Sequence, residues 1–343
     1  MSRIEAHSSQ SKRVGLALWG TEPVQTTVCH ARLAEQVGFE SIWLTDTQLI
    51  CRELYVTLAA CATATTRLGI ASGVTVPRTR HPSVTASALA TLGELSHGRA
   101  MTGISVGHSA LRNIGQLPAP IAELADYIAT VRQLLDGQTA RFESGSEGSL
   151  TWLGQPASVP LHVAATGPRL TRAAAGMADG VILLRGSALD LIEKGMDLVE
   201  QGLEDAGRAP GSVQTTAWIY VGLDHDMQRA QDQVRARVAA VLRMTDPSQF
   251  EGQDREAVER LHHDYDMFAH AQSMPPHATL VPERLISRYA VAGTPDEVHR
   301  RIAELSVDPR IDRVVVSPQI GAPDQSITHD FISHFGEAVL ARL

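Results

Sequence analysis

The stretch LGIASGVTVPRTRHPSVTASALATLGELSHGRAMTGISVG, residues 68–107, decides the fold. Its pattern predicts a strand over 68–76, an amphipathic helix over 83–96 and a second strand over 99–107. A helix between two short, almost wholly apolar strands is typical of a parallel sheet that is buried on both faces. Apolar residues at helical spacing mark one face of this helix, namely Val84, Ala88, Leu92 and Leu95.

The same strand–helix unit repeats along the chain. Eight such units fit a (β/α)8 TIM barrel better than an open α/β sheet, and this length is ordinary for one barrel. The sequence therefore predicts a single domain over 1–343, with insertions near the barrel mouth at 138–158 after strand four and 244–290 after strand seven. The expected strands are 14–20, 41–46, 68–76, 99–107, 161–165, 180–184, 215–222 and 312–318.

Composition narrows the class of protein. The net charge is −8 and there is no block of basic residues, which argues against a nucleic-acid partner. No apolar run is long enough to span a membrane, and the amino-terminal residues lack the apolar core of a signal peptide. The three cysteines have no C-x-x-C spacing, so neither disulfides nor zinc is indicated. We expect a soluble, cytoplasmic protein that does not bind membranes.

Two places point to an anion. Gly73 interrupts an apolar strand, which marks a bend or a close approach to the backbone, and Arg78, Arg80 and His81 follow it directly. The second place is HVAATGPRLTRAAAG, residues 162–176, which predicts a strand, a tight turn and a helix.

In that second place, Thr166 or Gly167 would cap the helix, and Pro168 suits its first position. Free N–H groups at such a helix start bind phosphate, and Arg185 after the next strand would add positive charge. An ordinary capped helix is the alternative.

Three further motifs have competing interpretations. GISVG, residues 103–107, matches the G-x-S-x-G nucleophile elbow, but no helix follows at once. The preferred interpretation is therefore that its small residues leave space for a flat ring, and not that Ser105 is a nucleophile. His262, Asp266 and His270 recur every four residues, a spacing compatible with a metal or with a solvated helix face; we predict no metal. Cys51, near Asp46, is interpreted as a buried or incidental thiol.

Three segments resemble the luciferase-like monooxygenase superfamily, and most of all its branch of methylenetetrahydromethanopterin reductases and related enzymes that use coenzyme F420. The segments are AEQVGFESIWLTD (34–46), TRHPSVTASALATLGELSHGRAMTGISVG (79–107) and ATGPRLTRAAAGMADGVIL (165–183). The resemblance covers residues 14 to about 186 well. It implies a (β/α)8 barrel that holds F420 or FMN across the mouth at the carboxyl ends of its strands.

The resemblance also implies site residues. It places a non-proline cis peptide bond at Gly73–Val74, against the ring, and the substitution Gly73→Val is then expected to weaken cofactor binding while leaving the fold largely intact. Asp46, Thr47 and His108 are the expected catalytic residues. The family often has a histidine after the acid, where this chain has Thr47, so Gln48, Cys51 and His108 are the other candidate proton donors. The expected cofactor-binding residues are Asp46, Gly73, Val74, Gly107, His108, Ser109, Thr166, Gly167, Pro168, Arg185 and Gly186.

The expected activity is hydride transfer between reduced F420 and a small organic substrate, by a homodimer or higher homo-oligomer. A two-component monooxygenase is the first alternative; it would use O2 and reduced FMN supplied by a separate flavin reductase. A non-catalytic flavin-binding barrel is an alternative of another class, and a Ser105 hydrolase is the last. Neither the substrate nor the choice between F420 and FMN follows from the residues.

Overall fold

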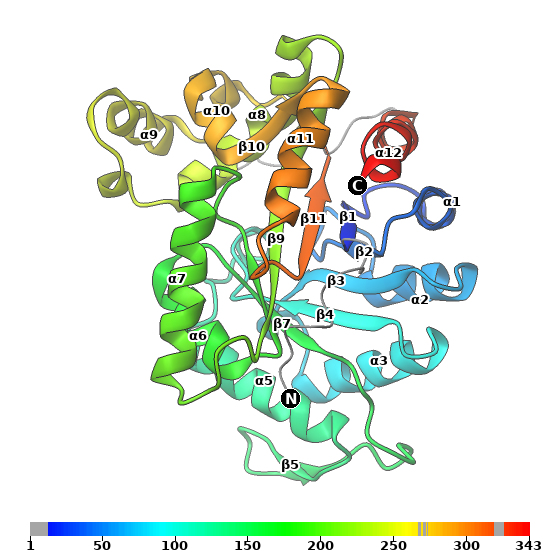
Figure 1. The fold of residues 1–343 in the computed structure, drawn as a ribbon. Helices are drawn as coiled ribbons and strands as arrows, with labels where there is room; N and C mark the ends of the chain where they lie inside the picture. Colours follow the sequence, from blue (N-terminus) through cyan, green and yellow to red (C-terminus); the bar gives the residue numbers. More distant parts are fainter. Residues whose placement is uncertain (1–12, 267–268, 270–271, 273, 319–325) are drawn as a thin grey trace.

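A computed structural model describes residues 13–266, 269, 272, 274–318 and 326–343, and within them eight parallel strands close into a barrel (Figure 1). Each strand pairs with its neighbours in the order β9, β11, β1, β2, β3, β4, β7, β8, and β8 pairs with β9 to close the ring. The predicted (β/α)8 fold is confirmed. The strands are β1 (Val14–Leu18), β2 (Ser41–Leu44), β3 (Gly69–Thr75), β4 (Ala100–Ile104), β7 (Leu161–Ala165), β8 (Gly180–Leu183), β9 (Gln214–Leu223) and β11 (Arg313–Ser317).

The strands are apolar on both faces because one face packs on helices and the other fills the barrel. Every residue of β1, β2, β8 and β11 is buried. Inside the barrel, the rings of Trp43 and Trp218 meet edge to face at 6.3 Å between centroids. Ala17, Ala71 and Val315 pack around them. The interior is therefore a packed core and not a pore.

Helices follow the strands and surround the barrel. Gly38 ends the first of them at φ 103°, a left-handed conformation that glycine adopts readily, and its N–H bonds the carbonyl of Ala34 at 3.2 Å. The helices of the repeating units are α1 (Val24–Val37), α2 (Leu54–Ala64), α3 (Pro82–Leu95), α4 (Ser109–Arg112), α5 (Ile121–Leu135), α6 (Pro168–Met177), α7 (Leu189–Asp205), α11 (Pro295–Ser306) and α12 (Ser326–Ala338). Short 3₁₀ helices span Pro77–Thr79, Pro247–Gln249, Pro276–Leu280 and Leu340–Arg342.

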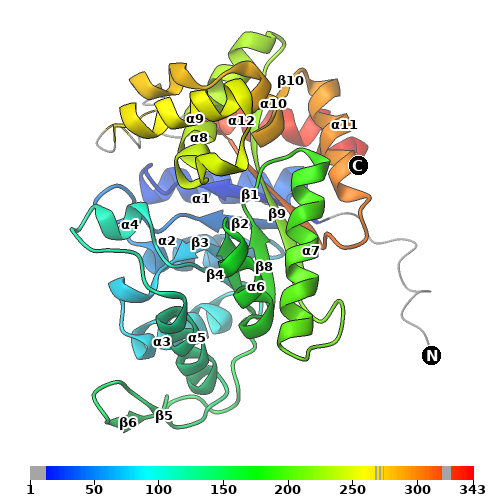
Figure 2. The same ribbon diagram turned by 90° about the vertical axis from the view of Figure 1, so that its left-hand side faces the viewer.

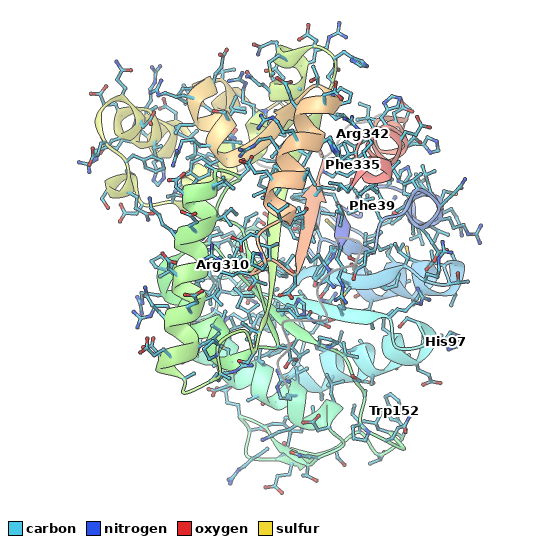
Figure 3. All side chains as sticks on the ribbon, in the orientation of Figure 1. Phe39, His97, Trp152, Arg310, Phe335 and Arg342 are labelled. Atoms are coloured by element: carbon cyan, nitrogen blue, oxygen red, sulfur yellow. The ribbon has the colours of Figure 1, made fainter. Side chains whose placement is uncertain are left out.

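The last helix closes the ring of helices. Phe335 of α12 stacks on Phe39, which follows α1, with 5.5 Å between ring centroids (Figure 3). Helix α11 starts with a capping box in which Thr294 and Glu297 bond each other's backbone N–H groups.

The apolar pattern in the sequence marks the buried face of α3 only in part: Leu92 is buried, as predicted. Val84 and Leu95 are 54% and 39% exposed. The rest of the buried side of this helix is formed by Thr85, Ala86, Leu89 and Ala90. Small side chains allow the helix to lie close to the strands, so burial follows size here and not only hydrophobicity.

The segment after β9 contains an element that the sequence did not predict. β10 (Ala290–Gly293) pairs in parallel with Tyr220–Leu223 of β9 and so adds a ninth strand outside the closed ring. The helices α8 (Met227–Met244), α9 (Gly252–Asp264) and α10 (Glu283–Tyr289) gather with β10 at the top of Figure 1 around their own apolar cluster. Four residues are too few to show a period, so the sequence pattern gives no sign of this strand.

The polar segment 138–158 forms a small hairpin of β5 (Ala140–Arg141) and β6 (Glu147–Gly148), seen at the bottom of Figure 2. It connects α5 to β7 along the outside of the barrel. Phe142 of the hairpin packs edge-on against His81, with 4.9 Å between ring centroids.

Candidate active site

The predicted site residues follow five different strands of the barrel. Asp46 and Thr47 come after β2, and Gly73 and Val74 lie within the last residues of β3. The remaining predicted residues follow β4, β7 and β8. Because all eight strands are parallel, their carboxyl ends meet at one mouth, which is where barrels of this kind place their chemistry.

The expected cis peptide bond is present at Gly73–Val74. At this point the pairing of β3 with β4 shifts between Ser72 and Thr75, so the strand bulges. The glycine itself is required by the barrel interior, because a Cβ at Gly73 would lie 2.8 Å from Trp218 and 3.0 Å from Trp43.

This packing corrects the expectation for Gly73→Val. A valine side chain has to displace two indole rings that fill the barrel, so the substitution disturbs the core as well as the mouth.

The cations after β3 are paired with the protein's own acids. The Arg78 guanidinium forms a bidentate pair with Glu123, with its Nε 2.7 Å from Oε1, and also bonds the carbonyl of Leu117. His81 caps α3 by accepting the N–H of Ser83. The expectation of an external anion at this loop is therefore wrong for Arg78, because its charge is already neutralised.

Arg80 and Asp46 form the centre of a hydrogen-bond network at the mouth. Arg80 Nη1 lies 2.5 Å from Asp46 Oδ2, and Arg80 Nη2 lies 2.6 Å from Glu53 Oε1. Asp46 is 5% exposed and also accepts from Gln48 Nε2 at 2.9 Å and from Thr75 Oγ1 at 3.1 Å. Sequence reasoning missed this pairing, since the partners are 34 residues apart and no spacing rule connects them.

The other candidate proton carriers differ in their surroundings. Thr47 is buried, and its carbonyl accepts the N–H groups of Ile50 and Cys51 in a tight turn. The Cys51 thiol donates to the carbonyl of Trp19 at 2.7 Å, and burial raises its pKa to about 11. His108 is exposed to solvent, yet partial desolvation of its ring, followed by the charge of Arg112, lowers the pKa of the imidazole. A neutral imidazole near pH 7 follows.

The loop after β4 shows no nucleophile elbow. Ser105 Oγ donates to the carbonyl of Ala164 at 2.9 Å, and among the described residues no imidazole or carboxylate bonds it. Gly107 has φ 78°, and a Cβ there would lie 2.9 Å from Val76, so this glycine is required by the backbone. Ser109 then starts α4, a single turn of four residues.

The turns after β7 and β8 fit an anionic group best. Gly167 is the N-cap of α6 and Pro168 its first residue, as predicted, and no side chain caps this helix start. A Cβ at Gly167 would meet nothing within 4 Å, so the space beside it is open. Helix starts of this kind present unpaired N–H groups and a positive dipole end.

Arg185 brings a charge to the same place. Its Nη1 donates to the carbonyl of Thr166 at 2.7 Å, while its Nε is buried with no partner among the described residues. Burial lowers the pKa of this guanidinium, and Tyr289 is the group that opposes the effect. A buried donor and a cation without a carboxylate suit a phosphate or carboxylate ligand. The neighbouring Gly186, at φ 108°, packs against the carbonyl of Arg288 and is required by the turn.

The spaced His and Asp residues after β9 do not share one helix. His262 lies on α9 and its Nε2 is 2.9 Å from the carbonyl of Leu242, whereas Asp266 follows the end of that helix. His270 lies outside the described residues. Within the part of the chain that the structure describes, no three His, Cys, Asp or Glu side chains come together as a metal site. The same residues include no helix with the length and apolarity needed to cross a bilayer.

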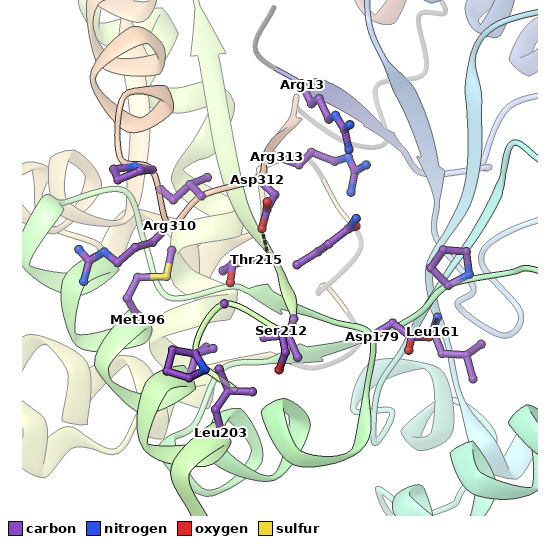
Figure 4. A pocket seen from close by; sticks show the side chains of 18 of the residues that line it. Arg13, Leu161, Asp179, Met196, Leu203, Ser212, Thr215, Arg310, Asp312 and Arg313 are labelled. Atoms are coloured by element: carbon purple, nitrogen blue, oxygen red, sulfur yellow. Dashed lines mark hydrogen bonds between the residues drawn. The ribbon is translucent and has the colours of Figure 1, made fainter. Parts of the chain in front are cut away.

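A large cavity of about 1220 Å³ lies at the opposite end of the barrel, where Arg13, Leu161, Asp179 and Arg313 line it at the starts of their strands (Figure 4). Asp312 accepts the N–H of Thr215 there at 2.7 Å.

Several charged groups that line the cavity are ion-paired within the protein. The pairs Arg132–Asp179, Arg310–Asp308 and Arg313–Glu40 each have an N–O distance of 2.9 Å. The amino ends of barrel strands generally support stability and not chemistry, so we place the candidate site at the mouth.

Known proteins match the chain over most of its length. The family model "Luciferase-like monooxygenase" matches residues 2–313. The 5,10-methylenetetrahydromethanopterin reductase of Archaeoglobus fulgidus is 29% identical over 325 residues, which are 92% of this chain and 94% of the relative. An F420-dependent glucose-6-phosphate dehydrogenase of Kineococcus radiotolerans is 29% identical over 283 residues, 77% of this chain and 79% of the relative.

Solved structures agree on the fold. The coenzyme F420-dependent tetrahydromethanopterin reductase of Methanopyrus kandleri superposes with a TM-score of 0.81 at 24% identity, covering 97% of this chain and 99% of that one. A monooxygenase from Streptomyces bottropensis superposes with a TM-score of 0.68 at 21% identity, covering 96% and 99%. At these identities the likeness concerns the fold.

Proposed function

Since this chain belongs to the luciferase-like monooxygenase family, we propose that it is an oxidoreductase that binds coenzyme F420 at the barrel mouth and exchanges a hydride with a small organic substrate. The observation on which the proposal depends is the uncompensated Arg185 beside the open start of α6. The preference for F420 over FMN is supported by a relative that is F420-dependent by name, the glucose-6-phosphate dehydrogenase of Kineococcus radiotolerans.

The mouth supplies two kinds of group for this reaction. The N–H groups at the start of α6, with Thr166, Gly167 and Arg185, would hold the anionic part of the cofactor. Val74 and the strand bulge lie between this turn and Asp46 in the strand order, where the ring would pass. When bound, F420 supplies the hydride from C5 of its ring. The protein positions the ring and handles the accompanying proton.

His108 is the group that we assign to the proton. The oxygens of Asp46 already accept from Gln48, Thr75 and Arg80, and Thr47 is buried. The Cys51 thiol is held by a carbonyl. His108 reaches solvent and is neutral near pH 7, so it is suited to accept the proton of a substrate hydroxyl when the substrate gives its hydride to oxidised F420. In the opposite direction, in which reduced F420 gives the hydride, the same imidazole would return a proton to the substrate oxygen.

A titration of the purified protein with F420 and FMN, each in the oxidised and reduced state, tests the proposal. We expect saturable binding of F420, followed by its absorbance and fluorescence, and weaker binding of both FMN states. Tight binding of reduced FMN with none of F420 would favour a monooxygenase and overturn the proposal. Esterase activity that is lost in Ser105→Ala would point to hydrolysis instead.

A further inference from the structure

Arg80 is held in one position by three elements. Its guanidinium bridges Asp46, after β2, and Glu53, the N-cap of α2, and lies 5.1 Å from the centroid of the Tyr55 ring. Its carbonyl accepts from the Tyr127 hydroxyl of α5 at 3.2 Å. The Arg80 side chain is 14% exposed, so the cation has little freedom to reorient.

Asp46 is held just as firmly. Its Oδ2 accepts from both Arg80 and Thr75, and its Oδ1 accepts from Gln48, with a longer contact to Arg80 Nη2 at 3.5 Å. A carboxylate has about four acceptor positions, and the one at Oδ1 that only the 3.5 Å contact occupies is the one that a stronger donor would take. All of these contacts are donated to the carboxylate, so Asp46 serves as an acceptor in each of them.

The positive charge of Arg80 is neutralised by carboxylates of the protein itself. Burial alone would lower the pKa of Arg80, but the hydrogen bond and charge of Asp46, followed by Glu53, raise it. Arg80 thus bonds two carboxylates and has no charge left over for an external anion. Arg80 therefore influences a ligand at the mouth only indirectly, by holding the Asp46 carboxylate in place.

Resting on the proposed function, we infer that Arg80 is a positioning residue: it fixes the Asp46 carboxylate as a hydrogen-bond acceptor for a donor on the bound ring. Asp46 then orients the ring and does not exchange a proton. Arg78 provides a matched comparison, because it is an ion-paired arginine two residues away whose partner, Glu123, lies on α5.

The test is a double-mutant cycle on the dissociation constant of oxidised F420, read from its fluorescence and requiring no turnover. We expect Asp46→Asn and Arg80→Met each to weaken binding about 20-fold, since a charged acceptor is lost or misplaced. The double variant should bind no more weakly than Asp46→Asn alone. Arg80→Lys should restore part of the affinity, and Arg78→Met should stay within about twofold of wild type.

Losses that multiply in the double variant would overturn the inference, because Arg80 would then act independently of Asp46. If Arg80→Met fails to fold, Asp46→Asn and the double variant still decide the matter, since neither leaves a buried carboxylate without its cation. A wild-type protein that binds neither F420 nor FMN would overturn the proposed function and this inference with it. Binding by wild type with multiplying losses would overturn the inference alone.

Discussion

The loop after β3 and the turns after β7 and β8 both bring arginines to the carboxyl end of the barrel, and they use them differently. Arg78 and Arg80 pair with carboxylates of the protein itself. Arg185 is held by a carbonyl, and one of its donors is buried without a partner among the described residues. An arginine near a strand end therefore indicates a ligand only when it forms no ion pair with a carboxylate of the protein itself.

The glycines of the two regions differ in the same way. Gly73 has no Cβ because two tryptophan rings occupy the space, whereas Gly167 faces open space at the start of α6. The glycine of the first region is therefore required by packing inside the barrel, whereas the glycine of the second lies beside open space.

The largest expected effect tests the internal role of the first region. Arg80→Met should lower the free energy of unfolding by about 3 kcal/mol, because Asp46 would remain buried without its cation. Urea denaturation measures this change. The double variant with Asp46→Asn should regain most of the lost stability. If Arg80→Met is as stable as wild type, the Arg80–Asp46 pair does not stabilise the fold and the contrast between the two regions is wrong.

Arg185→Met should weaken F420 binding about 30-fold, through loss of a charge-assisted contact. Its stability should change by less than about 0.5 kcal/mol, because no carboxylate is left unpaired. Arg172→Met is the control, since Arg172 lies on α6 but pairs with Asp205 on the surface. Equal effects of the two substitutions on affinity would argue against a ligand at Arg185.

Gly73→Ala should cost about 2 kcal/mol of stability, because even a methyl group meets the rings of Trp218 and Trp43. Tryptophan fluorescence during urea denaturation would follow both the rings and the unfolding. Gly167→Ala, in open space, should change stability by less than about 0.5 kcal/mol. Equal losses of stability in the two alanine variants would contradict the difference in packing between the two glycines.

The smallest effect is expected for Arg78→Met, which should lower stability far less than Arg80→Met, since the Arg78–Glu123 pair is partly exposed. The loss should shrink further at high salt, where exposed ion pairs are screened. A loss of stability as large as that of Arg80→Met would show that the exposure of the ion pairs does not explain how much each one stabilises the fold.

The position of much of the candidate site could be predicted because the carboxyl ends of parallel barrel strands meet at one end. Knowing which residues end each strand was enough to place Asp46, Thr166 and Arg185 at one mouth. The partners of those residues could not be predicted. Glu53 and Arg80 meet only because α2 and the loop after β3 lie side by side, and the exposed Val84 face of α3 depends on how closely that helix approaches the sheet.

By itself the sequence determined the eight alternating units, the barrel, the cap of α6 and the family resemblance, because period, turn residues and strand polarity are local properties of the chain. The tertiary structure alone decided which cations are neutralised, which glycines face a packed ring, and that β10 adds to the sheet. These depend on distances between segments that are far apart in the chain, and electrostatic pairing and packing act through such distances.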